Sequence, residues 1–233
     1  MEKLILLITF SFFMGIKQFW YAAYGSNLLE DRFLSYINGR RPWGNKGARD
    51  TEYLSQTDQC SIPYELYFAK HSKKWKGAVA FLDPQPKETN QTICRLYLVK
   101  QQQFIDIWTQ ENGNNPQTEP IPRSILMIPF ESHSFQDIGE RWYNRIIFLG
   151  FHTDGLPIYT ITNSKRFEVK EETFASEDYL VVLVNGFREM GFHDDEIKSY
   201  FLTQVGIKEE NLMKAFKEDY LEEVKQRLSN KNY

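Results

Sequence analysis

The chain has 233 residues, of which 42% are hydrophobic, 15% aromatic and 25% charged. This length supports one hydrophobic core, and the composition is that of a globular protein, which excludes a disordered or collagen-like chain. The net charge of −3 comes without a basic stripe, which argues against nucleic acid as a partner. Two cysteines are too few for a disulfide framework or a cysteine-built metal site.

An apolar run occupies Leu4–Ile16 near the start of the chain. It is too short to span a bilayer, so we expect no lasting membrane association, but its length suits the hydrophobic region of a signal peptide. Residues 1–16 are therefore either a signal-like segment or an extension that precedes a translation start at Met14. We expect residues 17–204 to form the main domain and residues 205–233 a charged C-terminal helix. The expected location is cytoplasmic, or exported if the signal interpretation holds.

Strand patterns dominate the first part of the chain. We expect strands over 18–24, 64–69, 75–82 and 93–99, and helices over 28–37 and 101–111. Between them, residues 38–61 are expected to form a long loop because they combine several Gly and Pro residues with many charges. Cys60 is then a loop thiol and Cys94 a thiol in a core strand.

Further strands are expected over 124–130, 142–149 and 157–162, after a loop over 112–122. The pattern then changes to helical. Ser176 is placed to cap a helix, and two more helices are expected over 194–204 and 209–228. Strands followed by helices indicate an α+β fold.

The first expected strand ends in Tyr24-Gly25-Ser26-Asn27-Leu28 and runs into a helix. Such a turn exposes consecutive backbone N–H groups, which can bind a carboxylate or a phosphate. The alternative is a purely structural turn in which Ser26 or Asn27 caps the helix. Taken by itself, the local pattern favours the capped turn.

A carboxylate continues an apolar stripe on the helix expected over 101–111. Phe104, Ile107, Trp108 and Glu111 fall at helical spacing and share one face. Because an ionised carboxylate is costly to bury, Glu111 either turns to solvent at the end of the helix or lies in a pocket suited to general acid–base chemistry.

Other catalytic patterns are missing from the sequence. The four histidines have no metal-ligand spacing, and there is no Walker, dinucleotide-binding or nucleophile-elbow motif, so the sequence gives no support for serine hydrolase, P-loop or Rossmann chemistry. Strands that contain Trp75 and Trp142 are expected to use these side chains for packing rather than as a sugar platform.

Several segments resemble the γ-glutamylcyclotransferase-like family. Phe19–Leu28 (FWYAAYGSNL) is similar to its opening motif, an aromatic strand that ends in AYGSNL, and Gly77–Leu82 to the strand before its catalytic helix. Ile107–Gly113 is similar to its pattern close to L-D-x-x-E-G and places Glu111 at the position of the catalytic glutamate. Here Trp108 replaces the usual Asp, and Asn112 is inserted before the glycine.

The resemblance extends over about 17–204. Ala175–Tyr179, followed by Gly186 and Gly191, is similar to the family's last helices, with Ala175 in place of a proline. Residues 142–157 resemble a bacterial subgroup of the family that is often misleadingly labelled as histone deacetylases.

The resemblance implies a mixed β-barrel with flanking helices and a helical C-terminal end. It also implies a small-molecule γ-glutamyl substrate, whose α-amine attacks the γ-carbonyl and releases 5-oxoproline, without a metal or an organic cofactor. Glu111 would be the catalytic proton shuttle. The substrate-binding residues would be the backbone donors of the opening motif and one hydroxyl group, namely Tyr24, Gly25, Ser26, Asn27, Leu28 and Tyr179.

Two other functions stay open on the sequence. The same fold could serve as a non-catalytic module that binds a γ-glutamyl or carboxylate group. The same reaction could also remove a γ-glutamyl protecting group from an amine during natural-product assembly. The leaving group, the oligomeric state and the role of the C-terminal helix are not set by the sequence.

Overall fold

The computed structural model describes residues 18–119 and 131–230. Its strands form a six-stranded sheet of order β2-β5-β1-β8-β7-β6 and a two-stranded hairpin, β3-β4. The strands are β1 (Gln18–Ala23), β2 (Thr57–Ile62), β3 (Leu66–Ser72), β4 (Gly77–Leu82), β5 (Thr92–Lys100), β6 (Phe135–Asp137), β7 (Arg145–Phe151) and β8 (Pro157–Thr162). The segment 1–16 and the strand expected over 124–130 lie outside the described residues.

Strand β1 lies in the middle of the sheet, antiparallel to β5 and parallel to β8. All of its residues except Gln18 are buried, as its continuous apolar run predicts for a strand covered on both faces. Because β1 is the central strand, the turn that comes directly after it lies in the interior of the protein.

The hairpin contacts the sheet through side chains and contacts the loop between α5 and α6 through its backbone. Thr162, at the end of β8, accepts a hydrogen bond from the Leu82 N–H (3.0 Å) and donates one to the Leu82 carbonyl (2.8 Å). On the other side, the Phe68 N–H of β3 donates to the Val205 carbonyl at 2.9 Å. Side chains of the hairpin and of the sheet belong to one hydrophobic core. The predicted α+β class is thereby confirmed.

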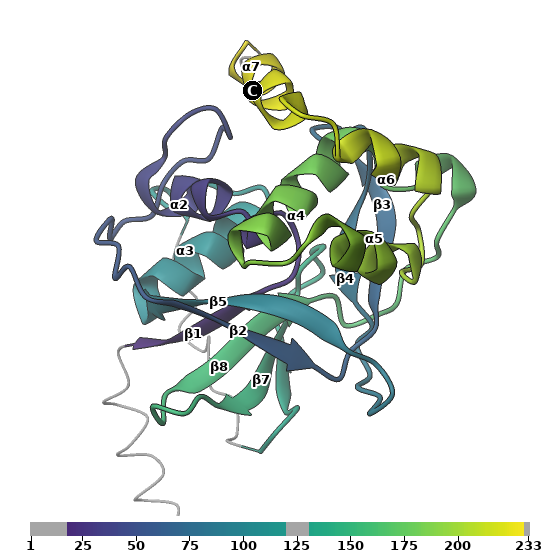
Figure 1. The fold of residues 1–233 in the computed structure, drawn as a ribbon. Helices are drawn as coiled ribbons and strands as arrows, with labels where there is room; N and C mark the ends of the chain where they lie inside the picture. Colours follow the sequence, from purple (N-terminus) through teal and green to yellow (C-terminus); the bar gives the residue numbers. More distant parts are fainter. Residues whose placement is uncertain (1–17, 120–130, 231–233) are drawn as a thin grey trace, which may run out of the picture.

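The helices cover the strands from above in the view of Figure 1, with α2 and α3 on one side and α4, α5 and α6 on the other. They are α2 (Glu30–Asn38), α3 (Gln101–Glu111), α4 (Glu177–Glu189), α5 (Asp194–Leu202), α6 (Glu209–Ala215) and α7 (Tyr220–Ser229), with short 3-10 turns η1 (Ser26–Leu28) and η2 (Glu171–Thr173). The predicted cap of α4 is confirmed, since the Ser176 side chain accepts from the Tyr179 N–H.

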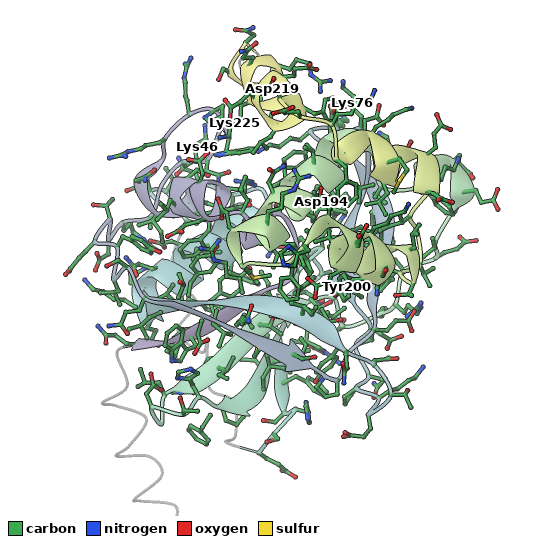
Figure 2. The ribbon with its side chains drawn as sticks, in the orientation of Figure 1. Lys46, Lys76, Asp194, Tyr200, Asp219 and Lys225 are labelled. Carbon is green, nitrogen blue, oxygen red and sulfur yellow. The ribbon has the colours of Figure 1, made fainter. Side chains whose placement is uncertain are left out.

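Helix α4 is the most buried of these helices, and α5 connects it to the sheet. Residues Leu180–Val184 are fully buried at the centre of the core. Tyr200, labelled in Figure 2, extends from α5 toward the sheet, where its hydroxyl accepts a hydrogen bond from the Ile93 N–H of β5 at 3.2 Å. The helical layer is therefore tied to the strands by a polar contact as well as by apolar packing.

The expected long loop over 38–61 is wrong at its end, where strand β2 forms. Four of the six β2 residues are exposed, because β2 pairs with β5 alone among the described strands, and its polar sequence TDQCSI lacks an apolar alternation. Cys60 is therefore a strand residue rather than a loop thiol, and it lies directly opposite Cys94 of β5. Cys94 is buried in a core strand, as predicted.

The single charged helix expected over 209–228 is also wrong, because the chain forms α6 and α7 with a break between them. Asp219, labelled in Figure 2 at the start of α7, has a left-handed backbone (φ 64°), which an α-helix does not accommodate. The break lets Leu212 of α6 and Val224 of α7 both reach the core beside α4.

Smaller differences affect strand ends. The hairpin strand β3 extends to Ser72, β4 begins only at Gly77, and β7 begins at Arg145 rather than 142. Trp75 and Trp142 therefore lie in turns, not in strands. Strand β6 is too short to produce a sequence pattern. Within residues 18–119 and 131–230, no helix has the length and apolar character needed to cross a membrane.

Candidate functional site

Two adjoining cavities lie between the turn after β1, the end of α3 and the start of α4. The inner pocket has a volume of about 30 Å³, and the outer cavity about 340 Å³. Four residues line both: Ser26, Glu111, Tyr143 and Tyr179. The structure therefore brings together residues that are far apart in the chain and that include most of the predicted site.

The turn after β1 is a 3-10 turn, closed by a hydrogen bond from the Leu28 N–H to the Gly25 carbonyl at 2.9 Å. The expected caps are wrong: neither η1 nor α2 has a side-chain cap, so Ser26 and Asn27 do not close a helix. The Asn27 side chain instead donates to Glu111 Oε1 at 2.8 Å, and the Tyr97 hydroxyl donates to the Asn27 carbonyl at 2.8 Å. The turn is thus held from two sides.

Glu111 is the last residue of α3, whose bounds agree with the prediction. Phe104, Ile107 and Trp108 on the same face are buried, whereas the Glu111 side chain lines both cavities. The sequence left two alternatives for this carboxylate, exposure to solvent or a place in a pocket, and the structure shows the second.

The Tyr36 phenol is a second polar neighbour of Glu111. Burial raises the pKa of Tyr36 well above its usual range; the charge of Arg32 opposes this shift, and the charge of Glu111 adds to it. The Tyr36 hydroxyl also accepts a hydrogen bond from Arg32 Nη2 at 2.6 Å. Arg32, Tyr36 and Glu111 therefore form a polar group in the wall of the outer cavity.

Trp108 and Asn112, the two residues that depart from the family pattern, both bind the backbone of Tyr143. Trp108 Nε1 donates to the Tyr143 carbonyl at 2.6 Å, and Asn112 Nδ2 donates to it at 3.1 Å. The Tyr143 N–H in turn donates to Asn112 Oδ1 at 3.0 Å. Trp108 and Asn112 thus fix Tyr143 beside Glu111, and the inserted residue leaves Glu111 facing the cavities.

Tyr179 and Gly25 approach each other closely. The Tyr179 hydroxyl accepts from the Ala80 N–H at 3.3 Å, and a Cβ atom at Gly25 would lie 3.0 Å from this hydroxyl oxygen. Burial raises the pKa of Tyr179, although the hydrogen bond from Ala80 lowers it in part. The phenol is therefore a neutral hydrogen-bonding group, and any side chain at position 25 would crowd its oxygen.

The other two predicted residues differ in their placement. Tyr24 lines the inner pocket, and its hydroxyl donates to the Ile161 carbonyl at 2.7 Å. Leu28 does not line either cavity: its side chain packs under α4, where a Cβ on Gly186 would lie 2.7 Å from Leu28 Cβ. Its N–H is used within the turn, so Leu28 offers no donor to a ligand.

Sequence reasoning did not find several residues that line the cavities. They are Tyr21, Ala80, Tyr143 and Ile161 around the inner pocket, and Arg32, Tyr36, Trp43, Lys74 and Trp142 around the outer cavity. One signal was available, because Arg32 and Tyr36 are four residues apart on a predicted helix and share its face. In the described part of the chain, no group of three or more His, Cys, Asp or Glu residues could hold a metal ion.

Comparisons of the sequence with known proteins found one curated relative and no matching family model. Histone deacetylase 5 of Arabidopsis thaliana is 34% identical over a region that covers 61% of this chain, and the chain spans only 23% of the length of that relative. The name of this relative agrees with the subgroup label expected from the sequence.

Among solved structures, a gamma-glutamyl cyclotransferase superposes with a TM-score of 0.51 and 13% identity, covering 92% of this chain and all of that one. An uncharacterized human protein superposes with a TM-score of 0.47, 14% identity and the same coverage. The first likeness shows that this chain has the gamma-glutamyl cyclotransferase fold.

Proposed function

We propose that this chain, which has the gamma-glutamyl cyclotransferase fold, is a cyclotransferase that releases 5-oxoproline from a γ-glutamyl amide or peptide. The observation that carries the proposal is the position of Glu111. Its carboxylate lies where the two cavities meet and is hydrogen-bonded to Asn27 of the turn that carries the AYGSNL motif. A carboxylate held in this way is suited to move protons for a substrate that supplies its own nucleophile.

In the proposed reaction, the α-amine nitrogen of the substrate attacks its γ-carbonyl carbon and forms the bond that closes the five-membered ring. The proton lost from this nitrogen passes to Glu111. When the bond from the γ-carbon to the departing nitrogen breaks, Glu111 returns the proton to that nitrogen. Holding the chain curled makes the attack intramolecular, which lowers the barrier by about 7–11 kcal/mol in well-oriented cases.

The residues around Glu111 support this role. The hydrogen bond from Asn27 to Oε1 fixes the carboxylate direction, and Tyr143 and Tyr179 line both cavities beside it. We place the glutamyl group against the turn Tyr24–Asn27, with the turn and the Tyr179 hydroxyl as donors to the developing oxyanion. The departing amine then lies on the outer side of Glu111.

A panel of γ-glutamyl amides and dipeptides, read by mass spectrometry for 5-oxoproline, tests the proposal. The panel includes γ-glutamyl derivatives of simple amines, which represent the deprotection reaction. The matched control substrates carry an N-acetylated α-amine and cannot cyclise, so we expect no product from them. Release of glutamate instead of 5-oxoproline would identify a hydrolase. Binding without any product would favour the non-catalytic module and contradict the proposal.

A further inference from the structure

The two cysteines of the chain lie opposite each other in the sheet. Cys60 of β2 and Cys94 of β5 are direct partners in the antiparallel ladder, and the two strands run side by side in Figure 1. Both are free thiols, and both side chains belong to the same hydrophobic core. Directly opposite residues have Cα atoms about 4.5–5.5 Å apart, within the range of about 4.4–6.8 Å that a disulfide spans.

One backbone hydrogen bond shows which type of ladder pair the cysteines form. The Leu98 N–H donates to the Gln56 carbonyl at 3.1 Å, and Gln56 continues the register of β2 opposite Leu98, so these two residues are a hydrogen-bonded pair. Hydrogen-bonded and non-hydrogen-bonded pairs alternate along an antiparallel ladder. Cys60 lies an even number of positions from Gln56, so Cys60 and Cys94 are also a hydrogen-bonded pair.

The two thiols differ in their access to solvent. Cys60 is partly exposed, whereas Cys94 is fully buried. The neighbouring Cys94 thiol lowers the pKa of Cys60, although burial and the charge of Asp58 raise it in part. Burial raises the pKa of Cys94 well above its usual range. Because the thiolate is the attacking form, Cys60 is the thiol that meets an oxidant first, with Cys94 beside it.

We propose that Cys60 and Cys94 form a reversible redox pair, which a low-molecular-weight disulfide oxidises to an intrachain disulfide. The Cys60 thiolate attacks one sulfur of the small disulfide, so that a mixed disulfide forms and one small thiolate leaves. Cys94 then loses its proton, its sulfur attacks the Cys60 sulfur, and the second small thiolate leaves. Both protein thiols are thereby oxidised, and the small disulfide is reduced to two thiols, which take up the two protons.

The ladder geometry makes this bond a reversible one. The Cβ atoms of directly opposite residues lie about 4.5–5.5 Å apart, and hydrogen-bonded pairs have the wider spacing. A disulfide requires about 3.5–4.5 Å between its Cβ atoms. Closing the bond must therefore draw the two strands together and distort the ladder between Cys60 and Cys94. A disulfide formed under such strain is reduced more easily than an unstrained structural one.

The test exposes the full chain to 2-hydroxyethyl disulfide. This oxidant has no γ-glutamyl group, so the result does not depend on the proposed cyclotransferase function. After an acid quench, we expect an intact mass about 2 Da below that of the reduced chain and the loss of both titratable thiols. Non-reducing electrophoresis should show a monomer. An excess of 2-mercaptoethanol, added to the folded oxidised chain, should restore both thiols.

Two single variants serve as matched controls. Cys94→Ala should stop at a mixed disulfide on Cys60, with a mass increase of about 76 Da. Cys60→Ala should stay unmodified while folded, because its remaining thiol is fully buried. Thermal melts confirm that each variant is folded, and the wild-type mass decides the case for a variant that is not.

Four results would overturn the redox pair. A wild-type chain that keeps both thiols, or that accumulates a stable mixed disulfide, would show that Cys94 does not reach the Cys60 sulfur. Disulfide-linked dimers would show that the two thiols react between chains. A wild-type disulfide that persists in excess 2-mercaptoethanol would be a structural bond, not a reversible one. Modification of folded Cys60→Ala at the rate of Cys94→Ala would contradict the order of attack.

Discussion

The side-chain amide of Asn27 donates a 2.8 Å hydrogen bond to Glu111 Oε1 and so links the turn after β1 to the end of α3. The two residues are 84 positions apart in the chain. Asn27 is itself held by Tyr97 of β5, which donates to its backbone carbonyl. The direction of the Glu111 carboxylate is therefore set by the central sheet and not only by its own helix.

Replacing Asn27 by alanine should lower the catalytic rate more than the affinity for substrate. The variant removes the donor that orients Glu111 and leaves the carboxylate free to turn, and loss of one such contact is expected to reduce kcat about tenfold. Asn27→Asp should be worse, because it places a second carboxylate against Glu111. Steady-state kinetics with a γ-glutamyl dipeptide measure both. An unchanged kcat in Asn27→Ala would show that Glu111 does not depend on this bond.

Gly25 and Tyr179 should behave as a coupled pair. Gly25→Ala adds a Cβ atom 3.0 Å from the Tyr179 hydroxyl oxygen and should displace the phenol or the turn. Tyr179→Phe removes that oxygen, so the double variant should be less impaired than the sum of the two single changes predicts. The measurement is a double-mutant cycle on kcat/KM and on thermal stability. Additive effects would contradict the direct contact.

Substitutions at the two acidic residues of α3 should have different effects. Changing Asp106 should lower the stability of the fold, whereas changing Glu111 should lower the catalytic rate. Asp106 is fully buried and accepts hydrogen bonds from the Arg49 N–H at 2.7 Å and from Arg49 Nε at 3.0 Å. Asp106→Asn weakens these charged contacts and should reduce the free energy of unfolding by about 1–3 kcal/mol. Below its melting temperature, the variant should still cyclise substrate. Loss of activity in a folded Asp106→Asn chain would assign a catalytic part to Asp106.

The His152 imidazole should make stability depend on pH. Burial lowers the pKa of His152, but its hydrogen bonds with Asp58 (3.0 Å) and Asp154 (3.1 Å) outweigh this effect and raise it overall. The hydrogen bond with His152 is the main cause that lowers the pKa of Asp58. Burial raises the pKa of Asp154, but the hydrogen bonds from the Leu156 N–H, Trp20 and His152 outweigh burial and lower it overall.

The sign of this dependence follows from the direction of the shift. Because the folded pKa of His152 lies above the unfolded value, the stabilisation is fully present below the unfolded pKa and is lost as pH rises through the folded one. The melting temperature should therefore fall as pH rises from about 6 to 8. The fall should be smaller in His152→Gln, which thermal melts at several pH values measure. A parallel pH dependence in both proteins would rule out this ion-pair cluster as the cause.

The central elements of the fold could be predicted because each has a strong local pattern. The apolar run of β1 and the helical stripe Phe104–Trp108 follow directly from burial. Edge strand β2 could not be predicted, because most of its side chains are exposed and only its backbone pairing with β5 defines it. The break at Asp219 was missed for a different reason, since neither Gly nor Pro marks it.

Site residues that belong to a sequence motif could be predicted. Site residues that reach the cavity only through tertiary packing could not. Glu111 and the turn Gly25–Asn27 were found through the family pattern, and the structure places them together. Tyr143 is held at the cavity by the contacts of its backbone with Trp108 and Asn112 and by the hydrogen bond from its hydroxyl to the Ala80 carbonyl, none of which a local pattern reports. Lys74 likewise belongs to the site because the hairpin turn folds against Trp43.

The measurement that tests the central claim most directly is 5-oxoproline release by Glu111→Gln. This change keeps the shape of the side chain and an oxygen that can accept from Asn27, but it removes the group that takes and returns the proton. The account predicts a loss of activity of about a hundredfold or more, the range of general acid–base catalysis, with the melting temperature unchanged. A folded Glu111→Gln chain that releases 5-oxoproline at a rate near that of the wild type would contradict the assignment.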